Sequence, residues 1–66
     1  MKLTDIMMET KFAPSRKQAL RLINQGAVRV HFGDDMYKVL GDSDVMEGIE
    51  FILNVGKRKW AKIKWD

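Results

Sequence analysis

The stretch SRKQALRLINQGAVRV, residues 15–30, is the part of this sequence that decides its fold. Ser15 and Gln18 match the capping box, in which each side chain satisfies an unpaired backbone N–H group at a helix start. Gly26 stands where the left-handed residue that closes a helix is expected. The spacing therefore predicts a helix over residues 16–25.

The predicted helix has two different sides. With about 100° of rotation per residue, one side is apolar and should pack on a core, whereas the opposite side is polar and free to meet a ligand. The apolar side consists of Ala19, Leu22 and Ile23, the polar side consists of Lys17, Arg21 and Asn24, and Arg16 and Leu20 flank the boundary.

A first helix is expected upstream of this one. Thr4 is a suitable amino-terminal cap, because its side chain can accept a hydrogen bond from a free backbone N–H group. Leu3, Ile6 and Met7 then follow at helical spacing and predict a stripe of core side chains. Pro14 should end this helix, since the residue before a proline avoids the helical region.

The rest of the chain shows the two-residue period of half-buried strands. Its last third predicts a hairpin with one apolar face and a basic returning strand. The predicted segments are a strand at 28–32, a turn at 33–35, a short strand at 36–40, an acidic loop at 41–48 with an extended piece near Val45, and a hairpin of residues 51–55 and 60–65 around a turn at 56–59.

The charges are segregated along the chain. The net charge of +3 is only a mild sign of an anionic partner. Residues 15–33 carry four cations and residues 56–64 carry five, and neither stretch contains an acid, whereas residues 34–50 carry six carboxylates and one lysine. Two acid-free segments are what a phosphate-facing surface requires, and ordinary solvated faces are the alternative interpretation.

The start of the longer helix is a candidate phosphate site. Its first backbone N–H groups point outward, and the helix dipole favours an anion there. Ser15, Arg16 and Lys17 add a hydroxyl group and two cations. Gln18 either completes the capping box or contacts a ligand, and Arg21, one turn further on, extends the cationic track.

The turn at residues 56–59 is a second cationic site, because Lys57, Arg58 and Lys59 follow one another there. The neighbouring Trp60 either stacks on an unpaired base or covers the edge of the hairpin. Basic turns are common on protein surfaces, so this site gains weight only together with the helix.

The sequence argues against an enzyme. His31 is the only histidine, so no site with two or more imidazole ligands can form, and no serine or cysteine is tied to it by a catalytic motif. Asp42 and Asp44 begin like a calcium loop, but Glu47 stands where that loop needs glycine. No glycine-rich phosphate loop is present. We therefore expect no catalytic residue, metal ligand, cofactor or small-molecule substrate.

The length of 66 residues suffices for a single domain, residues 1–66. The chain contains no cysteine, which fits a reducing cytoplasm and leaves the apolar core to hold the fold. No apolar run approaches the length of a membrane span, and no secretory leader is recognisable. We expect a cytoplasmic protein that makes no membrane contact and is monomeric as an isolated domain.

Residues 15–30 resemble the hallmark of S-four (S4) RNA-binding domains. The ending ILNVGKRKW, residues 52–60, and the FAPS of residues 12–15 resemble the branch found at the carboxy-terminal end of bacterial tyrosyl-tRNA synthetases. The resemblance covers nearly the whole chain. It implies an α+β fold of the alpha-L type, in which a helix-loop-helix packs on a small antiparallel sheet and the second helix docks on structured RNA. In the synthetases that RNA would be tyrosine tRNA, bound at a site separate from the catalytic domain.

Two positions depart from the family pattern. Leu20 stands where an arginine usually follows the alanine of the second helix, which removes one expected contact. His31 and Phe32 replace the usual asparagine–glycine pair, and Gly33 comes one place later. The resemblance carries RNA contacts over to Ser15, Arg16, Gln18 and Arg21, and the full expected set is Ser15, Arg16, Lys17, Gln18, Arg21, Asn24, Arg29, Lys57, Arg58, Lys59, Trp60 and Lys62.

Other functions remain open at this point. The same resemblance admits a free-standing S4 protein that binds ribosomal RNA, or the guide domain of an RNA-modifying enzyme such as a pseudouridine synthase. A DNA-binding helix-turn-helix is an alternative of another class, because two helices joined by a short turn could enter a major groove. A protein–protein module would need an exposed apolar patch, which the sequence does not clearly provide.

Overall fold

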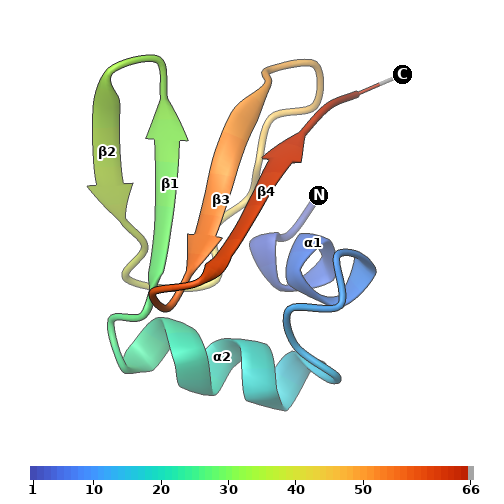
Figure 1. Ribbon diagram of the computed structural model, residues 1–66. Helices are drawn as coiled ribbons and strands as arrows, with labels where there is room; N and C mark the ends of the chain where they lie inside the picture. Colours follow the sequence, from blue (N-terminus) through green and yellow to red (C-terminus); the bar gives the residue numbers. More distant parts are fainter. Residues whose placement is uncertain (66) are drawn as a thin grey trace.

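The computed structural model describes residues 1–65, which form two helices followed by four strands (Figure 1). All pairs of neighbouring strands are antiparallel, and the strand order is β2-β1-β3-β4. This is the expected α+β fold. The elements are α1 (Leu3–Glu9), α2 (Arg16–Asn24), β1 (Val28–Phe32), β2 (Asp35–Lys38), β3 (Phe51–Val55) and β4 (Lys59–Ile63).

Helix α2 begins and ends as its sequence predicts. The Ser15 Oγ atom accepts a hydrogen bond from the Gln18 backbone N–H group at 3.3 Å. Gly26 has a φ angle of +74°, and the N–H groups of Gly26 and Ala27 donate to the carbonyl groups of Ile23 and Leu22. These two bonds satisfy carbonyl groups that the last turn leaves free. The predicted range is confirmed to within one residue.

The predictions for α1 are wrong at both ends. The helix begins at Leu3 instead of after Thr4, and Thr4 is a buried residue of the first turn whose N–H and hydroxyl groups both donate to the Asp42 carboxylate, at 3.1 Å each. The helix also ends at Glu9, well before Pro14. There Lys11 adopts a left-handed φ of +63°, and the N–H group of Phe12 donates to the carbonyl of Met7. A helix-closing motif thus replaces the expected effect of proline.

The core lies between the two helices and one face of the sheet. Strands β1 and β3 occupy the centre of the sheet, and their alternating apolar side chains face the helices as predicted. Within residues 1–65, no helix covers the opposite face of the sheet. The buried apolar residues are Leu3, Ile6, Met7, Ala13, Ala19, Ile23, Val28, Val39, Phe51, Leu53 and Val55.

The segment between β2 and β3 is held by the start of the chain. Lys2 and Asp44 form an isolated antiparallel bridge, one residue from the extended piece predicted near Val45. The predicted strand at 36–40 begins one residue earlier and ends two residues earlier, as β2. Met1 and Trp65 line one depression, and Figure 1 shows the N-terminus above α1, with α2 at the bottom. None of the helices within residues 1–65 is long and apolar enough to span a membrane.

Candidate nucleic-acid interface

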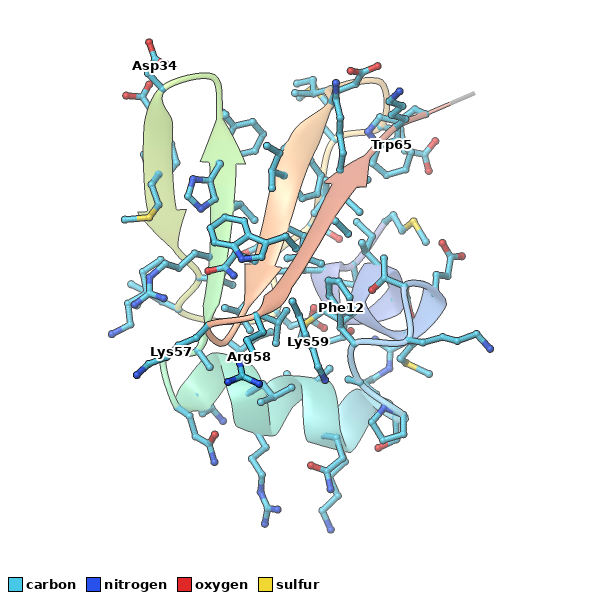
Figure 2. The ribbon with its side chains drawn as sticks, viewed as in Figure 1. Phe12, Asp34, Lys57, Arg58, Lys59 and Trp65 are labelled. Carbon is cyan, nitrogen blue, oxygen red and sulfur yellow. The ribbon has the colours of Figure 1, made fainter. Side chains whose placement is uncertain are left out.

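The tip of the β3–β4 hairpin lies alongside α2. At one end of the helix, the Gly56 N–H group donates to the carbonyl oxygen of Ala27 at 2.7 Å. At the other end, the Lys59 ammonium group donates to the carbonyl oxygen of Phe12 at 3.5 Å. Ala27 follows α2 and Phe12 precedes it, so the tip contacts the chain on both sides of the helix. Figure 2 shows Lys57, Arg58 and Lys59 beside α2.

This arrangement brings the two acid-free segments of the sequence together. Lys17 and Arg21 are exposed on α2, and Lys57, Arg58 and Lys59 are exposed at the hairpin tip. We call these five residues the basic platform. None of the ion pairs found within residues 1–65 involves any of them. Their charges are therefore available to an external anion, and Asn24 lies exposed on the same helix.

Arg16, the remaining cation at the start of α2, is placed differently. Its guanidinium group forms an ion pair with Asp5, lies 3.8 Å from the Asp42 carboxylate and donates a hydrogen bond to the Thr4 hydroxyl group. Arg16 thus ties α2 to α1 and to the segment after β2. An RNA contact by Arg16 stays a prediction, and it would compete with two carboxylates already in place.

We expect Arg16→Ala to lower the free energy of unfolding by about 1 kcal/mol, because partly exposed ion pairs and hydrogen bonds each contribute about that much or less. Lys17→Ala is the matched control, since Lys17 is exposed and has no partner within residues 1–65. Urea unfolding followed by circular dichroism measures both. Equal stability of the two variants would contradict a structural role for Arg16.

The capping box at the start of α2 is only half formed. The Ser15 hydroxyl oxygen accepts the Gln18 N–H bond, but the side-chain amide of Gln18 makes no hydrogen bond to any described residue. The expectation that this amide completes the cap is therefore not met. Gln18 is exposed, and its amide can both donate and accept a hydrogen bond.

Three of the expected residues lie away from the platform. Arg29, Trp60 and Lys62 project from the face of the sheet that the helices leave open, because their cross-strand partners are residues of that face. The Lys62 ammonium group is 4.0 Å from the Glu50 carboxylate. The expected set therefore divides into a group around α2 and a group on the sheet.

The acidic stretch of the sequence is divided between two places, because Asp42 contacts Arg16 at the start of α2 whereas the β1–β2 turn lies at a distance from the platform. Asp34, in the β1–β2 turn, is at the top of Figure 2, whereas the platform residues of the hairpin tip are near the bottom. Clusters of like charge steer an approaching partner of opposite charge, so the five cations of the basic platform favour the approach of a polyanion to α2 and the hairpin tip.

The structure also has an exposed apolar patch, contrary to the expectation from the sequence. Side chains from separate segments meet there around a groove of about 420 Å³. Sequence reasoning missed it because these residues are spread from the end of β1 to the segment before β3 and have no shared period. The exposed apolar side chains that line it are Phe32, Tyr37, Leu40, Met46 and Ile49.

Comparisons with known proteins agree with this geometry. The S4 domain family matches residues 1–30, which contain both helices and the start of β1. A tyrosine–tRNA ligase of Sulfurimonas denitrificans is 40% identical over 62 residues, which are 94% of this chain but only 14% of that protein. No solved structure gives a significant match. In its helix pair and its sheet the chain is similar to the S4 family of RNA-binding domains, and over nearly its whole length it is similar to one part of a tyrosine–tRNA ligase.

Proposed function

We propose that this domain docks folded RNA, with tRNA as its ligand, through the basic platform. The observation that supports the proposal is the pair of contacts between the hairpin tip and the residues on either side of α2, because they bring Lys57, Arg58 and Lys59 beside the helix that carries Lys17 and Arg21. Lysine and arginine side chains that neutralise phosphates release counterions, which is the main source of affinity for a nucleic acid. We favour tyrosine tRNA because the similar protein is a tyrosine–tRNA ligase.

The shape of the platform suits a folded RNA better than a DNA groove. A helix-turn-helix protein inserts its second helix into the major groove, and the groove must accommodate that helix without obstruction. Here the hairpin tip lies along α2 and adds cations beside it. Structured RNA is recognised largely through backbone and shape, which a broad cationic surface can provide.

The domain would act as the tRNA-binding part of a larger synthetase. It spans only 14% of the length of the ligase that it resembles, so aminoacylation would belong to other parts of such a protein. This assignment places the domain in the cytoplasm, where tRNA is charged. A free-standing S4 protein that binds ribosomal RNA and the guide domain of an RNA-modifying enzyme are the alternatives, and the open reading frame around this sequence distinguishes them.

We expect the isolated domain to bind tRNA with an affinity that falls steeply as salt increases. Each phosphate contact contributes about 0.7 to 0.9 to the slope of log affinity against log salt, so engagement of all five platform cations gives a slope of about −4. Fluorescence anisotropy with labelled tyrosine tRNA, between about 50 and 200 mM salt, measures this slope.

The controls for this titration are a DNA duplex of similar length and a tRNA of another identity. Equal or tighter binding to the DNA duplex would favour the helix-turn-helix alternative. A slope near zero would contradict docking by the platform, whatever the affinity. Equal binding to both tRNAs would leave RNA docking intact and reject selectivity for tyrosine tRNA within this domain.

A further inference from the structure

The face of the sheet opposite the core is an open surface with its own composition. In an antiparallel sheet, residues directly paired across strands project from the same face. The strand register thus defines two rows on this face. The row nearer α2 is Lys38, Arg29, Asn54 and Trp60, and the next row is Met36, His31, Ile52 and Lys62.

Trp60 is the central feature of the open face. Its side chain is 55% exposed, although a tryptophan that packs fully can remove about 150–250 Å² from water. The indole ring is nevertheless supported, because its centroid lies 5.3 Å from that of the His31 ring, at an interplanar angle of 44°. The His31 Nε2 atom is buried and has no hydrogen-bond partner among the described residues, so this imidazole acts as packing for the indole.

The charges on this face are those of an anion-binding surface. Arg29 and Lys38 belong to it and have no ion pair among the described residues, whereas Lys62, in the row farther from α2, lies 4.0 Å from the Glu50 carboxylate. A Cβ atom added at Gly26 would lie 2.8 Å from the Lys38 ammonium group, so this cation sits over the end of α2. Lys38, which the sequence analysis did not single out, thereby links the open face to the basic platform.

We propose that the open face binds an unpaired nucleotide of the same RNA, with its base stacked on Trp60 and its phosphates near Arg29 and Lys38. This proposal rests on the proposed function, since the RNA would be held by the platform. The supported indole offers a flat ring to a base of any identity, and cations on the same row offer partners to the flanking phosphates. An acidic partner without a base would leave the indole ring without a stacking contact. An uncharged partner would leave the cations without an anion.

The test compares two forms of one RNA hairpin, blunt or with a short uridine overhang at its 5′ or 3′ end. We expect the wild-type domain to bind the better overhang form about 5- to 150-fold more tightly than the blunt form, the range that stacking of one base on an aromatic side chain provides. In Trp60→Ala this preference disappears, so that both hairpins bind with the same affinity. Trp60→Phe retains part of the preference.

Tyr37→Ala is the matched control. Tyr37 is also aromatic and 55% exposed, but it pairs with Val30 and projects from the other face of the sheet. This variant should keep the full preference for the overhang. A wild-type domain that binds both hairpins equally, or a Trp60→Ala variant that keeps the preference, overturns the inference while leaving platform docking intact. Failure of the wild type to bind either hairpin at low salt rejects the proposed function itself.

Discussion

Replacing Leu53 with alanine is expected to leave much of the chain unfolded at room temperature. Leu53 is fully buried in the central strand β3, where it pairs with Val30 of β1 and Ala61 of β4. Truncation of a buried leucine to alanine costs about 2–5 kcal/mol, because transfer free energy is lost and a cavity remains. A domain of this size, without disulfides, has a total stability of only about 3–5 kcal/mol.

Urea unfolding followed by circular dichroism measures this effect. Leu40→Ala is the matched control, because Leu40 is 82% exposed and the same atoms are removed. We expect its free energy of unfolding to stay within about 0.5 kcal/mol of the wild-type value. Similar losses in both variants would show that the core does not lie where the structure has it.

Reversal of one platform charge is expected to weaken RNA binding by about tenfold or more at moderate salt. Arg21→Glu would remove one of the proposed phosphate contacts and add a repulsive charge on the exposed face of α2. It should also lower the magnitude of the salt slope by about 1. The fold should persist, because Arg21 is exposed and has no ion pair among the described residues.

The matched control for this reversal is Lys64→Glu. Lys64 is also exposed, and it follows the end of β4 that is remote from α2, so the net charge changes equally while the platform is untouched. Anisotropy titrations with labelled tRNA compare the two variants. If both weaken binding to the same degree, RNA responds to net charge alone and the platform is not the docking surface.

Local signals made α2 and the last hairpin predictable. The start and end of α2 depend on Ser15 and Gly26, which act within a few residues of themselves, and the hairpin depends on an alternation that is visible in the sequence. The start of α1 depends instead on Asp42, which holds the backbone of Thr4 from 38 residues away. A seven-residue helix contains too little periodic pattern to reveal such a partner.

In the candidate site, too, some features could be predicted from local sequence and others depend on residues far away in the chain. Charge segregation identified the cations of the platform, because exclusion of acids from a segment is a property of sequence alone. It gave no means of separating Arg16 from its neighbours, since the partners of Arg16 are Asp5 and Asp42, which lie outside the acid-free segment. The support of Trp60 by His31 likewise depends on the register of three strands, which places side chains 29 positions apart in contact.

The shared location of Met1 and Trp65, remote from α2, has a consequence for larger proteins that contain such a domain. A polypeptide attached near Met1 or Trp65 would start away from the basic platform, so the platform could bind a ligand that another domain of the same protein also holds. A short flexible tether gives an effective concentration in the millimolar range. Even a binding surface of low affinity on this domain would then be mostly occupied. The ligand would dissociate much more slowly from the whole protein than from either domain alone.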